Sequence, residues 1–160
     1  MMELMSARLT LLLLLCLVVD PSRAANVTET TVCELVQQPK RYKGRMVRFA
    51  AEWTRTQRWI VVDEPGGECG PILVALPTES GIHPRPRFTA VQDAQLDKFL
   101  NSSFVLLLNP KTQKRGKITA TLQGRFDVAF LLGGFGHGKL YRFRLVLQQV
   151  SNVFVEDGQD

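Results

Sequence analysis

The chain has 160 residues, 45% of them hydrophobic and 22% charged, which is the composition of a globular domain and excludes a disordered tail. Its 20 basic and 15 acidic residues leave a net charge of +5, a mild surplus that does not by itself indicate a nucleic-acid partner. Setting aside a predicted leader at 1–24 leaves 136 residues, so we expect a single domain over 25–160, not two.

An export signal is predicted at the amino terminus. Residues 9–19 form an uncharged apolar run that follows Arg8 and precedes Pro21. A helix of this length rises only about 16 Å, roughly half the hydrocarbon thickness of a bilayer, so it is too short to span a membrane. The alternative is a buried helix, but five consecutive leucines leave it no polar face to present to water.

The cleavage site of this signal is predicted after Ala24. Ser22 and Ala24 are small residues at the two positions that a signal peptidase reads. A lipoprotein leader would place a small residue before the modified cysteine, whereas Leu15 precedes Cys16. We therefore expect a secreted or periplasmic protein, with no membrane span in the mature chain.

Two cysteines, Cys33 and Cys69, remain once the leader and its Cys16 are removed. In an oxidising compartment an even number of cysteines indicates a disulfide, and we expect these two to pair. Free thiols are one alternative. A zinc site with His83 and His137 is another, but structural zinc ligands usually come in close pairs such as C-x-x-C, and these four residues do not. No metal and no cofactor is expected.

The first half of the mature chain predicts a short helix and three strands. The helix is expected at 32–38, where Thr31 and Glu34 form a capping box and Pro39 ends the pattern. Hydrophobic residues then alternate with polar ones over 45–54, the period of a strand with one buried face. Two further strands, at 58–64 and 72–76, follow in meander order.

The second half predicts a connection, helical segments and two strands. Four prolines and glycines make 77–88 an exposed extended connection. Apolar residues recur at helical spacing over 92–108, as one helix or as a helix followed by a strand. Strands are expected at 117–126, with a bulge at Gly124, and at 140–153. The glycines of 133–138 lie between these strands, so they indicate a tight reversal with positive φ and not a dinucleotide site.

This element order is three strands, a helix and two strands. It is the layout of the oligonucleotide/oligosaccharide-binding (OB) barrel, a five-stranded, partly open Greek-key barrel. We therefore predict a mostly β fold of this kind, with the helix between strands three and four and a short amino-terminal helix. The alternative is a small antiparallel sheet packed on one helix.

Two stretches of the chain resemble a family of exported bacterial proteins of unknown function. They are VCELVQQPKRYKGRMVRFAAEW at 32–53, and RGKITATLQGRF at 115–126 together with GGFGHGKLYRFRLVLQQVSNV at 133–153. The family pattern is a cysteine in the short helix, Tyr-x-Gly before the first strand and Gly-x-Gly-His before the last. The matching positions are Cys33, Tyr42 with Gly44, and Gly134, Gly136 and His137. The resemblance covers about half of the mature chain and implies an exported barrel, but no activity.

A ligand site is predicted where two loops frame the second and third strands, as in barrels of this type. Aromatic rings beside cations in these loops suit a sugar or single-stranded nucleic acid. The competing interpretation is that the first tryptophan belongs to the core and the arginines are merely solvated. The candidate residues are Trp53, Arg55, Arg58 and Trp59 in the first loop, and Phe135, His137 and Lys139 in the second.

A second candidate site is a basic face on the outward side of the last two strands. Such a face attracts polyanions, although cations on an exposed strand also guard against edge-to-edge aggregation. Its residues are Lys117, Arg125, Arg142 and Arg144.

No catalytic group is assigned from the sequence. His137 has no nominated nucleophile or carboxylate partner, and the carboxylates are scattered along the chain. We therefore predict a non-enzymatic binding or interaction module, with a protein or glycan partner favoured over nucleic acid. The alternatives are a nuclease-like hydrolase on a barrel scaffold and a structural component of an envelope assembly.

Overall fold

The computed structural model describes residues 26–54, 59–67, 69–108, 117–130 and 133–156. The predicted leader at 1–24 lies outside the described residues, as do Arg55 and Arg58. The export signal and its cleavage after Ala24 therefore stay predictions.

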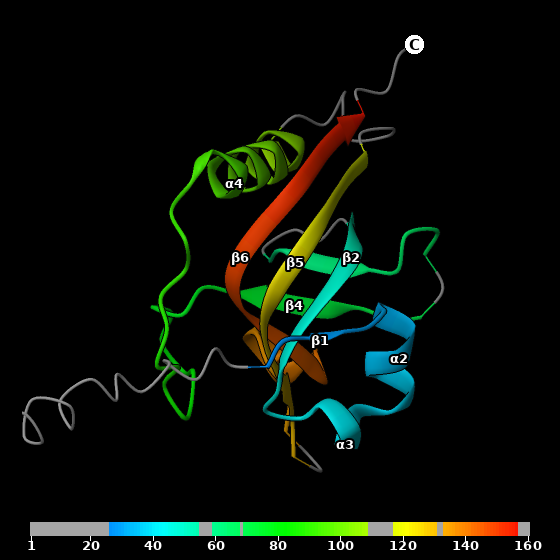
Figure 1. Ribbon diagram of the computed structural model, residues 1–160, viewed down its shortest axis with the longest axis vertical. Helices are drawn as coiled ribbons and strands as arrows, with labels where there is room; N and C mark the ends of the chain where they lie inside the picture. Colours follow the sequence, from blue (N-terminus) through cyan, green and yellow to red (C-terminus); the bar gives the residue numbers. More distant parts are fainter. Residues whose placement is uncertain (1–25, 55–58, 68, 109–116, 131–132, 157–160) are drawn as a thin grey trace, which may run out of the picture.

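The described residues form a mostly β fold, as predicted (Figure 1). The predicted helix at 32–38 is present but does not end the helical path at Pro39, because this proline occupies the first turn of a second short helix. Residues 92–108 contain one continuous helix, which settles the alternative left open by the sequence. The helices are α2 (Val32–Gln37), α3 (Pro39–Tyr42), α4 (Ala94–Leu108) and a 3-10 turn, η3 (His137–Lys139). The strands are β1 (Thr28–Glu29), β2 (Met46–Thr54), β3 (Val61–Asp63), β4 (Ile72–Ala75), β5 (Lys117–Val128) and β6 (Phe143–Glu156).

The six described strands form one mixed sheet that curls into a partial ring. Strand β2 pairs antiparallel with β3, β3 with β4, and β5 with both β2 and β6. The ring is completed by β4 and β6, which run parallel to each other. The five predicted strands are all present, and the short β1, which the sequence did not predict, adds a parallel edge to β2.

The main core fills the inside of this ring. Large side chains from β2, β5 and β6 meet there, among them Phe49, Phe126 and Leu145. Helix α4 packs against β6 and β5 and buries Leu96 and Phe99 (Figure 1). The strand side chains of this core mostly come from every second residue, so the period of two in the sequence identified the inner face of the sheet correctly.

The outer side of β6 is also covered, which the sequence did not predict. Ile82, from the proline-rich connection, packs against Ala75 of β4 and Val146 of β6 in a second, smaller cluster. The backbone N–H of Val91 donates to the carbonyl oxygen of Gln148 at 2.7 Å and fixes the end of this connection along β6. The connection at 77–88 is therefore not simply an exposed loop, and residues 143–147 of β6 are buried on both faces.

Helix α2 is held by hydrogen bonds of Thr31 and Glu34 and by the pairing of Cys33 with Cys69. Thr31 caps it as predicted, since its hydroxyl accepts the backbone N–H of Glu34. The Glu34 carboxylate accepts hydrogen bonds from the hydroxyls of Thr30 and Tyr42, and these bonds lower its pKa. Cys33 lies at disulfide-bonding distance from Cys69, with their Cα atoms 4.9 Å apart, so the predicted pair is brought together.

Loss of the Cys33–Cys69 link is expected to destabilise the protein. The pair is separated by 36 residues in sequence. Replacing both residues (Cys33→Ser with Cys69→Ser) should remove about 3 kcal/mol and lower the Tm by roughly 10 °C. Thermal unfolding followed by circular dichroism measures this. A reductant should shift the parent protein by the same amount and leave the double variant unchanged. Iodoacetamide labelling of both cysteines in the unreduced, exported protein would contradict the link.

Strand β5 carries the predicted bulge at Gly124. The register between β5 and β6 shifts between Gln123 and Gly124. A Cβ atom at Gly124 would collide with the carbonyl oxygen of Val146 and lie 3.1 Å from the Cα of Leu147. Both atoms belong to the backbone of the neighbouring strand, so neither can move without disturbing the sheet. Glycine is therefore required here by the close approach of two strands.

Gly124→Ala is expected to lower the free energy of unfolding by about 2 kcal/mol or more, because the added methyl overpacks two paired strands. Urea unfolding measures the loss. Gly133→Ala is the matched control, since among the described residues a Cβ there would meet only the carbonyl oxygen of Phe130, at 3.2 Å. We expect the control to lose less than about 1 kcal/mol. Equal losses in the two variants would show that the strand contact is not the cause.

Candidate functional site

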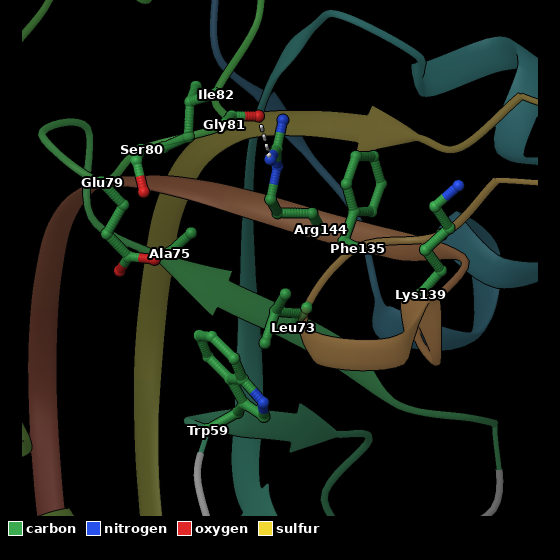
Figure 2. A pocket seen from close by; sticks show the side chains of 12 residues that line it. Trp59, Leu73, Ala75, Glu79, Ser80, Gly81, Ile82, Phe135, Lys139 and Arg144 are labelled. Carbon is green, nitrogen blue, oxygen red and sulfur yellow. Dashed lines mark hydrogen bonds between the residues drawn. The ribbon is translucent and has the colours of Figure 1, made fainter.

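A cavity of about 340 Å³ lies on the outer side of β4, and we call it the Trp59 cavity. Figure 2 shows Trp59 on one side of it, Arg144 and Phe135 on the other, and Leu73 of β4 between them. The chain segment that follows β4 closes a third side. The lining residues are Trp59, Leu73, Ala75, Glu79, Ser80, Gly81, Ile82, Gly134, Phe135, Gly136, Lys139 and Arg144.

The glycine-rich segment positions Phe135 and Lys139 in this cavity. It forms a tight reversal, as predicted: Phe135 and Tyr141 exchange backbone hydrogen bonds of 2.7 and 3.2 Å. Gly136 has φ +75°, and a Cβ at Gly134 would collide with the carbonyl oxygen of Lys139. The reversal therefore brings Phe135 and Lys139 to the same cavity from positions four residues apart.

A second cavity of about 400 Å³ adjoins the first, and we call it the Arg125 cavity. Phe135 and Arg144 line both cavities, so the two are separated by these side chains. Gly81 and Ile82 line the first cavity, and the next two residues of the chain, His83 and Pro84, line the second. The lining residues are Lys43, Gly44, His83, Pro84, Arg125, Asp127, Val128, Ala129, Phe130, Phe135 and Arg144.

Arg144 is held at the boundary by several contacts. Its Nη2 donates to Oδ2 of Asp127 at 2.7 Å, and its Nη1 donates to the carbonyl oxygen of Gly81 at 3.3 Å. The guanidinium carbon lies 4.1 Å from the centre of the Phe135 ring, a cation–π contact. Nε is buried and has no hydrogen-bond partner among the described residues. Arg144 is 6% exposed, so this cation is almost removed from water.

Asp127 joins two arginines. Arg125 donates to both of its carboxylate oxygens, from Nε at 2.8 Å and from Nη2 at 3.1 Å, and Arg144 donates to the second oxygen. Both ion pairs are largely buried. Two guanidinium groups therefore share one carboxylate, which leaves the network with one uncompensated positive charge.

The first predicted ligand site is brought together in part. Trp59, Phe135 and Lys139 all line the Trp59 cavity. Trp53 is 7% exposed and lies in the core, so the competing interpretation of this tryptophan as a core residue is confirmed. His137 begins η3, but its side chain lies outside the described part of the chain, as do Arg55 and Arg58.

The predicted basic face is not assembled as one exposed patch. Lys117 opens β5 and pairs with Glu52 at 2.8 Å, which raises the pKa of this lysine. Arg125 lies eight residues further along the same strand. Arg142 is exposed, whereas Arg144 is buried because the segment after β4 covers the side of β6 that alternation assigned to solvent.

Several lining residues were not predicted from the sequence. Asp127 follows Arg125 by two residues on β5 and is paired in register with Arg144 of β6. The Arg-x-Asp pattern on β5 would have predicted this ion-pair network if the register between β5 and β6 had been known. Lys43, Gly81 and Phe130 come from connections, and no strand or helix pattern places such residues in advance.

The described residues include no group of three or more histidines, cysteines or acidic residues that could hold a metal ion. Within the same residues, no helix is both long enough and apolar enough to cross a membrane. Comparisons of the chain with protein-family models, with curated proteins and with solved structures find no match.

Asp127 is expected to matter more for stability than either arginine. Asp127→Asn leaves two buried guanidinium groups without a carboxylate and should cost about 3 to 5 kcal/mol. Arg144→Met leaves the Arg125–Asp127 pair balanced and should cost less than about half as much, since the methionine keeps the apolar packing. Urea unfolding compares the two variants. A greater loss for Arg144→Met would contradict the shared-carboxylate network.

Proposed function

We propose that this protein is an exported, non-enzymatic binding module that holds a glycan in the Trp59 cavity. The observation that carries the proposal is the convergence of Trp59, Phe135 and Lys139 on the outer side of β4. These residues come from two connections that are far apart in the sequence. Aromatic rings and a cation at one concave site are what a binding module needs.

The scaffold we propose is an OB-type barrel like that of the exported bacterial family that the sequence resembles. Its support is the order of pairing, in which β2, β3, β4, β6 and β5 follow one another and β5 returns to β2. The position of α4 between β4 and β5 agrees with the layout of that barrel. In such barrels the loop between strands one and two and the loop between strands four and five frame the site for oligosaccharides and oligonucleotides. Trp59 comes from the connection between β2 and β3, and Phe135 and Lys139 come from the connection between β5 and β6, which supports the proposal.

The chemistry of the lining favours a sugar over a purely apolar ligand. Leu73 and Ala75 give an apolar floor, against which the C–H face of a pyranose ring packs. Glu79 and Ser80 lie on the Ala75 side of this floor (Figure 2), and together with Lys139, which also lines the cavity, they supply acceptors and donors for sugar hydroxyls. The volume, about 340 Å³, is that of a small-ligand site and suits one or two sugar units.

Binding is favoured over hydrolysis by the distribution of carboxylates. A hydrolase of this kind needs two or more acidic residues that meet an arginine in one groove. Among the described lining residues, Glu79 is the one carboxylate of the Trp59 cavity and Asp127 is that of the Arg125 cavity. Export is supported by the disulfide distance between Cys33 and Cys69, because such bonds persist outside the reducing cytoplasm.

Trp59→Ala is expected to weaken glycan binding about tenfold or more, the loss of roughly 1 to 3 kcal/mol that stacking on an aromatic ring provides. Isothermal titration with cellohexaose and chitohexaose measures the affinities, after circular dichroism has shown that the variant is folded. Phe154→Ala is the matched control: Phe154 is an aromatic residue on β6, 57% exposed, that does not line the cavity. The affinity of Phe154→Ala for both oligosaccharides should equal that of the parent protein.

Two outcomes would overturn the glycan proposal. One is the absence of binding to either oligosaccharide at millimolar concentration. The other is binding of a labelled single-stranded oligonucleotide alone, with the logarithm of the binding constant falling linearly with the logarithm of salt concentration. That result would assign the cavity to a polyanion.

A further inference from the structure

We propose that the Arg125 cavity is a binding site for an organic anion, a carboxylate attached to an apolar body. This site is separate from the Trp59 cavity, and the inference goes beyond the glycan proposal without depending on it.

The charge of the lining is the first observation. Lys43, Arg125 and Arg144 bring three cations to the cavity, and among the described lining residues Asp127 brings the one carboxylate. Leaving His83 out of the sum, two positive charges remain unbalanced. One of them belongs to the buried network in which two arginines share Asp127, where solvent screens it poorly. An anion that enters the cavity compensates this charge.

The second observation is that the cations are held in place before any ligand arrives. Asp127, the carbonyl group of Gly81 and the ring of Phe135 fix the guanidinium of Arg144 from three sides. Its Nε is nevertheless without a partner among the described residues. Arg125 is fixed by two hydrogen bonds to the same carboxylate. Because the side chains are already ordered, an anion gains their attraction without the entropy cost of ordering them.

The third observation is the apolar surface beside these cations. Phe130 is 74% exposed, and Nζ of Lys43 lies 5.6 Å from the centre of its ring. Pro84, Val128, Ala129 and Phe135 complete the apolar part of the lining. An inorganic anion would leave this surface in water, whereas a carboxylate with an aromatic or alkyl body covers it while meeting the cations. The volume of about 400 Å³ accommodates a ligand of this size.

The test uses phenylacetate as the probe, phenylacetamide as its neutral isostere and inorganic phosphate as an anion without an apolar body. Each is titrated into the purified ¹⁵N-labelled protein, and amide chemical shifts are followed. We expect phenylacetate to shift the amides of Gly44, Val128, Ala129 and Phe130. Phenylacetamide and phosphate should each bind at least about fivefold more weakly, because each lacks half of the recognised chemistry.

Variants then test which cations contribute to phenylacetate binding. Lys43→Gln changes an exposed side chain and should weaken phenylacetate binding about threefold or more, as the loss of one partly screened charge. Lys40→Gln is the matched control, an exposed lysine of α3 that does not line the cavity, and its affinity should equal that of the parent. Arg144→Met, checked for folding by circular dichroism, should weaken binding about tenfold, because a buried charge is screened less than an exposed one.

Three results would overturn the site. The first is that phenylacetate at 10 mM, about the weakest binding of interest, shifts no amide. The second is that phenylacetamide binds as tightly as phenylacetate. The third is that both Lys43→Gln and Arg144→Met bind phenylacetate with the affinity of the parent. Affinity for phosphate equal to that for phenylacetate would reduce the site to a general anion site and refute its apolar half. The oligosaccharide titrations use other probes and another variant, so either proposal can fail alone.

Discussion

Strand β4 runs parallel to β6, and parallel strands cannot be joined by a tight hairpin. The chain between them must therefore cross over, and it uses this path to build α4 and β5 before β6 returns beside β4. The crossover starts with the proline-rich connection, which lies over the outer side of β6. One pairing thus determines where the helix packs, which strand faces are buried and where the two cavities form.

Burial of an arginine is the main electrostatic consequence of this arrangement. Arg144 is near the start of β6, under the connection, and its charge is balanced only in part by Asp127. A buried ion pair is weak support for stability, since desolvation offsets much of the attraction. The two arginines that share one carboxylate, at the junction of two cavities, are the feature on which the proposed anion site rests.

Much of the fold could be predicted from local patterns. Over 46–53 of β2 and 117–127 of β5, buried side chains alternate with less buried ones, so the period of two identified these strands and their inner faces. Gly124 marked its bulge, and Thr31 marked the start of α2. These features depend on residues close together in the sequence.

The features that could not be predicted depend on contacts between distant segments. Alternation placed Arg144 on a solvent-facing side, because no local pattern shows that Ile82 will cover that side of the sheet. The same limitation hid the role of Asp127, whose partner Arg144 is 17 residues away. Trp59, Phe135 and Lys139, which line one cavity, were predicted to lie together from the loop positions of the predicted barrel, whereas the lining side chains of the crossover were not predicted.

Phe135 and Arg144 stand as a common wall between the two cavities. Ligands bound in the two proposed sites would therefore border the same ring and guanidinium. If both proposed ligands bind, any coupling between the two binding equilibria must be reciprocal. By whatever factor the first occupant changes the affinity for the second, the second changes the affinity for the first by the same factor.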